Sequence, residues 1–351
     1  MSNGAMSNQE WHGSKRGLNR RRAVGGLAGA ALAGWLPGLA VAAPWKPDQN
    51  VEFVVPAGAG GALDQVGRAM KQFYDETGDA PPGKTFLVSN KPGGNGKIAF
   101  DALKQRPGDA NFLSLNTHGY IASYLTGNLD VLPHREFTTI AVLQDEFLTL
   151  AVRADSPIRN VSDLLTAMRR DPASQRMGVA TSIGNHIHVG TAKALKAGGV
   201  DIKKLVVAPF KSSSESIVAL VGGHLELVAS TTPNVIAMLQ AGKIRLLAVS
   251  SAQRLGGAFK DVPTWRESGV DSDFSSALGI IAPKGITADQ LAYWEARCKE
   301  LVEHKEWKLL VERNQSRSHF MPHAEASAYY EREYQSMRGI VAELGLLQVK
   351  T

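Results

Sequence analysis

Three observations in the sequence predict an α/β fold made of two lobes. After residue 42, short β-rich runs alternate with helical patterns, as in α/β proteins. Gly/Pro-rich turns repeatedly follow the strands, and in open α/β sheets ligands gather beyond the carboxyl ends of strands. The length after residue 42, about 309 residues, fits one large domain or two medium ones. Several such turns can face one cleft only if two sheets face each other, so two lobes are the simplest arrangement.

Residues 1–42 are typical of an export signal and not of the fold. A basic region precedes the apolar, Ala/Gly-rich run 23–36, which is too short for a transmembrane helix. Residues 40–42 (AVA) form a small-residue cleavage site. The Arg pair within 19–22 also resembles a twin-arginine signal, with an ordinary Sec signal as the alternative. We therefore expect an exported, periplasmic protein.

Removal of this segment nearly neutralises the chain. The whole sequence has 39 Lys and Arg against 33 Asp and Glu, whereas residues 43–351 have 34 against 32. No Lys/Arg run that would follow a phosphate backbone occurs in this part, so nucleic-acid binding is not expected. The one cysteine, Cys298, lies in a helical pattern and is expected to be a small buried residue.

The predicted elements alternate along the chain. Strands are expected at 51–55, 85–89, 112–116, 139–143, 149–152, 177–180, 204–207, 225–229, 245–250 and 276–282. Helices are expected at 64–77, 96–104, 161–171, 186–197, 214–222, 235–241, 287–305 and 323–343. Ser214 is a candidate N-cap, and Thr287 with Gln290 fits a capping box.

The turn after the first strand is the leading candidate for an anion site. Residues 51–64 (VEFVVPAGAGGALD) run from an apolar strand through a glycine-rich turn into a helix. Backbone N–H groups at a helix start lack internal partners, the helix dipole adds partial positive charge, and glycines admit close approach. A carboxylate or phosphate would fit there. The candidate residues are Ala57, Gly58, Gly60, Gly61 and Asp64.

Asp64 is expected to cap the helix and organise this loop. Its carboxylate would repel an anionic solute unless a water or the solute's own hydroxyl or amine intervenes. A ligand with an amino group is therefore not excluded. The alternative for the whole segment is a plain tight turn.

Further polar turns follow later strands. A second cradle, from the opposite lobe, is expected at Thr181, Ser182, Gly184, Asn185 and His188. The remaining candidates are Asn116, Thr117 and His118 near the distal end of the ligand, then Lys211, Ser212, Thr231 and Thr232. A plain loop and a solvated lysine are the alternatives.

Metal and enzyme chemistry find little support. His186 and His188 are two residues apart and point away from each other on a helix, and no third ligand is evident. The turn from Gly58 fails the G-x-G-x-x-G pattern because Leu63 occupies the last position, and GGNGKI lacks the Ser or Thr of a P-loop. No nucleophile elbow or carboxylate pair is found. We expect no cofactor, no metal and no catalysis.

Seven segments in order resemble the periplasmic solute receptors of tripartite tricarboxylate transporters, the Bug-type receptors. The resemblance covers nearly all of residues 45–347. Asp64 and Arg68 match the first-strand motif, Asn90 to Gly93 match an N-[RK]-P-G segment, and Gly184, Asn185 and His188 match a G-S-x-x-H-like segment. The other segments are LSLNTHGYIAS, VVAPFKSSSESIVALVGGHLEL, KIRLLAVSSAQRLGGAFKDVPTWRESGVD and ALGIIAPKGIT.

The resemblance implies a type II-like periplasmic binding fold of two α/β lobes with a ligand cleft between them. It implies a monomeric receptor that captures a small organic carboxylate and delivers it to membrane permease subunits. The lobes are expected at 43–147 plus 273–351 and at 148–272. A sensory receptor for a two-component system and an exported enzyme acting on a small acid are the alternatives. Ala57, Ala59, Asn185, Ser212 and Ser213 depart from the usual family residues, so the identity of the carboxylate stays open.

Overall fold

The computed structural model describes residues 44–348, and the predicted export signal lies outside them. These residues form one compact unit of alternating strands and helices. The strands are β1 Val51–Val55, β2 Phe86–Asn90, β3 Phe112–Thr117, β4 Thr138–Arg153, β5 Met177–Ala180, β6 Val207–Phe210, β7 Leu227–Thr231, β8 Ile244–Val249, β9 Ser275–Ala282 and β10 Arg317–Pro322.

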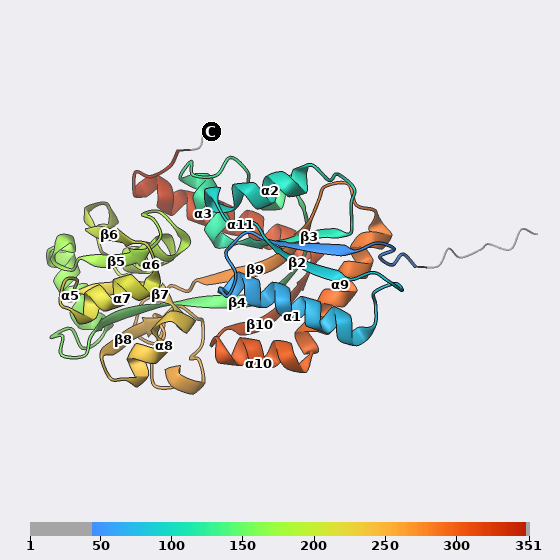
Figure 1. Ribbon diagram of the computed structural model, residues 1–351. Helices are drawn as coiled ribbons and strands as arrows, with labels where there is room; N and C mark the ends of the chain where they lie inside the picture. The colour runs from blue at the N-terminus through green and yellow to red at the C-terminus, as the bar shows by residue number, and fades with distance from the viewer. Residues whose placement is uncertain (1–43, 349–351) are drawn as a thin grey trace, which may run out of the picture. The chain divides into compact units, whose positions relative to one another are not determined.

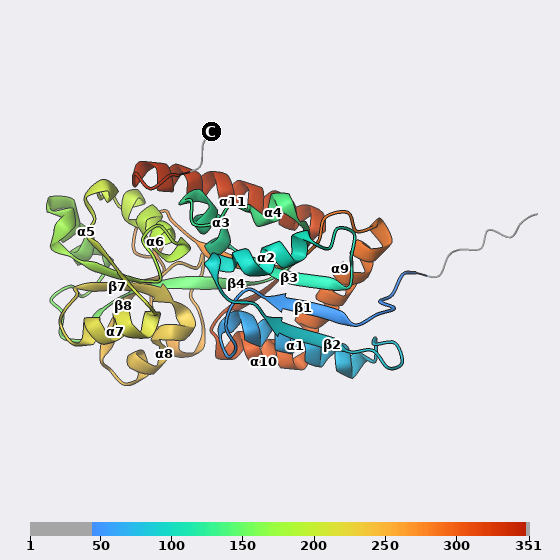
Figure 2. The same ribbon diagram turned by 45° about the horizontal axis from the view of Figure 1, so that its top comes forward.

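The helices flank this sheet (Figures 1 and 2). The α-helices are α1 Ala62–Thr77, α2 Lys97–Lys104, α3 His118–Leu125, α4 Pro133–Glu136, α5 Val161–Arg170, α6 His186–Ala197, α7 Ser213–Val221, α8 Thr232–Gln240, α9 Ala288–Glu303, α10 Lys305–Arg313 and α11 His323–Glu343. Short 3₁₀ turns lie at Gly94–Gly96, Pro172–Ser174, Ile202–Lys204 and Gly257–Phe259.

The sheet has two parts that share β4. In the first part, β1 lies between β2 and β3 with parallel pairing, and β9 joins β3 to the Thr138–Phe147 half of β4. In the second part, β5 lies between β6 and β7, and β7 and β8 both pair with the Leu148–Arg153 half of β4. Figure 1 shows β4 passing from the group of α5–α8 into the group of α1, α9 and α10. The prediction of a two-lobe α/β fold is confirmed.

Close packing of α1 against the sheet explains the residues found along this helix. Helix α1 buries Val66, Met70, Phe73 and Tyr74, which recur at helical spacing, and it ends at Gly78 with φ +67°. A Cβ on Gly67 would lie 3.0 Å from the Val55 side chain, so glycine lets α1 approach β1. Helix α11 packs on β4 and β10 and also contacts α3 and α6.

Several element boundaries differ from those predicted. The strands predicted at 139–143 and 149–152 are one strand, β4, because the polar residues 144–146 continue the ladder with β9. Helix α1 begins at Ala62 and not at Asp64, and the N-cap of α7 is Ser212, whose hydroxyl accepts from the Glu215 N–H, and not Ser214. The predicted helix 287–305 ends at Glu303, and α10 begins after it.

Other predictions are confirmed or extended. The capping box of Thr287 and Gln290 is present, and Cys298 is fully buried. Helices α3, α4 and α10 and strand β10 were not predicted. The strand predicted at 225–229 is β7, which lies at Leu227–Thr231, so Thr231 is the N-cap of α8.

Candidate functional site: helix starts at the junction of the two sheet parts

The loop between β1 and α1 is organised by Asp64. The N-cap of α1 is Gly61, so the prediction that Asp64 caps the helix is wrong, since Asp64 is the third helical residue. Its buried carboxylate accepts hydrogen bonds from the Gly60 N–H at 2.8 Å, from Arg68 Nε at 2.8 Å and from Asn90 Nδ2 at 3.0 Å. These hydrogen bonds lower the pKa of Asp64 although burial opposes them. Asp64 therefore fixes the loop, while Gly58, Gly60 and Gly61 are exposed beside the helix start and Ala57 is partly buried.

The start of α3 places the three polar residues that end β3. Thr117 is its N-cap and accepts from the Gly119 N–H at 3.2 Å. His118 is fully buried: its Nδ1 accepts from the Ala277 N–H at 3.1 Å, and its Nε2 lies 3.4 Å from a Glu333 oxygen. Asn116 is also fully buried, and its side-chain amide has no hydrogen-bond partner among the described residues. A buried amide without a partner needs a group that the chain itself does not supply.

The start of α6 contains an unusual backbone. Thr181 has φ +64°, a conformation that β-branched residues rarely adopt and that often marks functional loops. Asn185 is the N-cap of α6, accepts from the His188 N–H at 2.9 Å and donates to Thr181 Oγ1 at 3.2 Å. The Gly184 N–H donates to His188 Nδ1 at 3.0 Å, and burial lowers the pKa of His188 to about 4. Ser182 is partly exposed beside them.

The starts of α7 and α8 differ in exposure. Lys211 is exposed, and its backbone N–H donates to the Glu215 carboxylate at 3.1 Å. The Ser212 hydroxyl accepts from the Glu215 backbone N–H at 3.2 Å. Thr231 and Thr232 are buried, and the Thr232 hydroxyl lies within hydrogen-bond distance of the carbonyl oxygens of Asn314 and Gln315, at 3.3 and 3.2 Å. The second sheet part therefore contacts the segment after α10 at this point.

Direct contacts connect these helix starts. The Tyr120 hydroxyl of α3 donates to the Pro56 carbonyl before the α1 loop at 3.3 Å. A Cβ on Gly119 of α3 would lie 3.4 Å from His186 Nδ1 at the first residue of α6. On the other side, Asn314 Nδ2 lies 3.5 Å from Gln65 Oε1 of α1, and its carbonyl accepts from Thr232. The starts of α1, α3, α6 and α8 thus lie around one junction.

Two residues at this junction, His186 and Glu146, were not predicted from the sequence as ligand-binding candidates. His186 is partly exposed, faces α3, and has a pKa lowered to about 3 by burial among protein groups and by His118. Glu146 is partly exposed on β4, and burial raises its pKa to about 7 against the effect of a hydrogen bond from Thr231. His186 was considered only as part of an H-x-H pair, for which no metal role is expected, and Glu146 falls between the strands predicted at 139–143 and 149–152.

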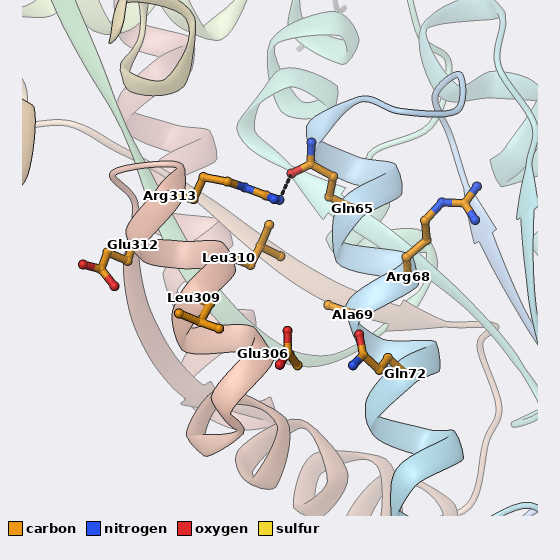
Figure 3. Close-up of a pocket in the computed structure, with 9 residues that line it drawn as sticks. All are labelled: Gln65, Arg68, Ala69, Gln72, Glu306, Leu309, Leu310, Glu312 and Arg313. Carbon is orange, nitrogen blue, oxygen red and sulfur yellow. Dashed lines mark hydrogen bonds between the residues drawn. The ribbon is translucent and has the colours of Figure 1, made fainter.

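Figure 3 shows a different pocket, of about 730 Å³, between α1 and α10. It is lined by Gln65, Arg68, Ala69, Gln72, Glu306, Leu309, Leu310, Glu312 and Arg313. Arg313 donates to Gln65 Oε1 at 3.1 Å across it. Charges of both signs line this groove, and none of the predicted ligand-binding residues lines it.

Two further features concern metal binding and membrane insertion in residues 44–348. Within this range, no three or more His, Cys, Asp or Glu side chains are grouped to hold a metal ion. In the same residues, no helix combines the length and apolar character that crossing a membrane requires.

The chain is similar to known proteins in sequence and in fold. Residues 78–345 match the model of the tripartite tricarboxylate transporter family receptor. A UPF0065 protein of Bordetella bronchiseptica is 29% identical over 293 residues, which are 83% of each chain. A ligand-free TctC solute-binding protein from Polaromonas is similar in structure, with a TM-score of 0.72, 25% identity and coverage of 85% of this chain and 99% of that one. A protein of R. palustris solved with adipate has a TM-score of 0.69 at 23% identity, covering 86% and 99%. The chain belongs to the tripartite tricarboxylate transporter receptor family, a family of periplasmic solute-binding proteins rather than enzymes.

Proposed function

We propose that this protein captures a small organic carboxylate at the junction of the two sheet parts and passes it to the membrane subunits of a tripartite transporter. The observation that carries the proposal is the arrangement of four helix starts around one junction, each after the carboxyl end of a strand. Unpaired N–H groups and the positive ends of helix dipoles there favour an anion.

The proposed contacts divide between the two sides. Backbone N–H groups of Gly58, Gly60 and Gly61 would hold one carboxylate, with the loop kept in place by Asp64. The second sheet part would contribute Thr181, Ser182 and Asn185. The Asn116 amide on β3, which has no partner among the described residues, would supply a donor or an acceptor from the first sheet part. His186 has a neutral imidazole at pH 7 and can donate one hydrogen bond without adding charge.

The proposed lobe boundaries follow the pairing of β4. Residues 43–147 with 273–351 would form one lobe and residues 148–272 the other. The register supports a boundary beside Phe147, because Phe147 pairs with β9 and Leu148 pairs with β7. Closure on the ligand would then bend β4 and the segment before β9.

Ligand binding is tested by thermal unfolding of the purified protein against a broad panel of carboxylates. A ligand at a hundred times its dissociation constant adds about 2.7 kcal/mol to the free energy of unfolding. A shift confined to one chemical series is the expected result. A well-folded protein that no carboxylate stabilises, while a substrate is turned over, would favour the enzyme alternative.

Gly61→Asp separates binding from folding. The backbone at Gly61 has φ −79°, which any residue adopts, and its Cβ would meet only the Gly58 carbonyl oxygen at 3.8 Å. Aspartate is a favoured N-cap, so the variant should fold at least as well as wild type. Its negative charge beside the N–H groups should abolish carboxylate binding, whereas the neutral control Gly61→Ser should retain it. Equal binding by Gly61→Asp and Gly61→Ser would place the anion elsewhere.

Export, partnership and oligomeric state have separate tests. We propose that residues 1–42 are removed on export to the periplasm, which N-terminal sequencing of the periplasmic protein checks. We propose a monomer, which light scattering checks. Uptake of the bound carboxylate should stop when the permease genes are deleted, whereas persistence of uptake with loss of a transcriptional response would favour sensing.

A further inference from the structure

The junction contains a carboxylate that no cation neutralises. Asp145 and Glu146 are adjacent on β4, so their side chains point to opposite faces of the sheet. Asp145 accepts from Arg317 Nη2 at 2.5 Å and from His319 Nδ1 at 2.8 Å. Among the described residues, no Lys, Arg or His forms an ion pair with Glu146, and the causes of its pKa shift include no charged neighbour.

Glu146 lies where the two sheet parts meet. Its partner on β9 is Ser276, and two residues further along β4 Leu148 pairs with Thr231 on β7. Thr231 is the N-cap of α8, and its hydroxyl accepts from Asn234 Nδ2 at 2.8 Å. The Thr231 hydroxyl is also near enough to the Glu146 carboxylate to lower its pKa. A hydroxyl has one hydrogen to donate, so Thr231 can satisfy at most one of about four acceptor positions on that carboxylate.

The ionised form of Glu146 is costly here unless a cation binds to it, and without a cation the carboxyl takes up a proton more readily. A carboxylate enclosed by protein and lacking a cation is disfavoured, which is why burial raises the pKa of Glu146. The side chain is still partly exposed, so a group from outside the chain can reach it. An anion alone would be repelled by Glu146, whereas a ligand that also bears a positive charge would pair with it.

We propose that Glu146 determines specificity by binding a cationic nitrogen, so that the carboxylate captured by this receptor is an amino-acid-like zwitterion. The inference rests on the proposed function and refines its ligand class. The ligand carboxylate would lie at the helix starts, and its ammonium would donate to Glu146 beside Thr231. A site built for an ammonium rejects an analogue without it, because the carboxylate is then left unpaired.

The test is calorimetric titration of the purified protein with matched ligands that differ at one substituent. Aspartate, malate and succinate carry an ammonium, a hydroxyl or a hydrogen at the same carbon; glutamate with glutarate, and phenylalanine with 3-phenylpropionate, extend the comparison in size and polarity. The amino member of the series that binds should bind about tenfold or more tightly than its partners, an ordinary value for one charge-assisted pair.

Glu146→Gln should remove this preference by weakening the amino member about tenfold while changing its partners by less than about threefold. Glu303→Gln, at an exposed residue near the end of α9, is the matched control and should behave as wild type. Tighter binding of the plain acid by wild type, or an unchanged preference in Glu146→Gln, would overturn the inference while leaving the receptor function intact. No binding by any acid in any series would count against the receptor function itself.

Discussion

The two faces of β4 treat neighbouring carboxylates in opposite ways. On one face, Asp145 is fully buried and held by Arg317 and His319, which lower its pKa against the effect of burial. On the other face, Glu146 has only the Thr231 hydroxyl, and burial raises its pKa to about 7. A carboxylate satisfied by its own chain stabilises a fold, whereas one left without a cation is available to a ligand.

The largest effect is expected from Asp145→Asn. The variant keeps the shape of the side chain but leaves Arg317 and His319 without their anion. Because those two side chains are partly exposed, we expect a loss of about 2 kcal/mol in the free energy of unfolding rather than the larger cost of a fully buried pair. Urea unfolding at pH 7 measures it, with Glu303→Gln as control. A loss no greater than in the control would show that Asp145 is not stabilised by its partners.

The pH dependence of Glu146→Gln should sharpen the contrast. The folded pKa of Glu146, about 7, lies above the ordinary value, so the folded state binds its proton more readily and the ionised residue is a cost at high pH. Glutamine removes that cost. The full pKa shift corresponds to about 3 kcal/mol, and the partial exposure of Glu146 reduces it. The variant should therefore be more stable than wild type by about 2 kcal/mol at pH 8 and equally stable at pH 4. Urea unfolding at the two pH values measures the difference.

The folded pKa of Asp145 is shifted in the opposite direction, so its contribution to stability depends on pH with the opposite sign. Its folded pKa is lowered, so the stability it contributes is present above its unfolded pKa and is lost as the pH falls through the folded value. Asp145→Asn should therefore converge with wild type only in strong acid. Parallel pH profiles for the two variants would remove the distinction between the two faces of β4.

A smaller effect is expected from Thr231→Val. The valine fills the same space but cannot donate to Glu146, so the pKa of Glu146 should rise further. The difference in stability between wild type and Glu146→Gln begins at the unfolded pKa, and it should level off at a pH higher by less than about one unit when the Thr231→Val change is added to both, which raises the midpoint of the difference. An unmoved midpoint would mean that Thr231 does not interact with the ionised carboxylate.

Much of the fold was predictable because its signals are local. Buried apolar runs gave most strands, and the periodicity of residues such as Val66, Met70 and Phe73 gave helix α1. Turns after strands were found from glycines and polar residues, which is why the helix starts of α1 and α6 were predicted near their observed places. Helix α10 had the same kind of signal in Trp307, Leu310 and Val311, but it was not predicted, because the predicted helix ended at residue 305.

The features that could not be predicted from the sequence depend on contacts between distant segments. Residues 144–146 are polar, so they suggested a break in β4, and only the register with β9 shows that the strand continues. That register also decides which face each carboxylate occupies, and a shift by one residue would exchange Asp145 and Glu146. His118 was predicted to lie near the distal end of the ligand, and its burial against Ala277 and Glu333 follows from contacts between distant segments. Contact of the predicted ligand-binding residues with a solute stays a prediction.

The most direct test is a crystal structure of the protein with the carboxylate that gives the largest thermal shift. We predict density between the starts of α1 and α6, with carboxylate oxygens within hydrogen-bond distance of the Gly58–Gly61 backbone and an ammonium beside Glu146. Density in the groove between α1 and α10 (Figure 3), with the junction empty, would contradict it.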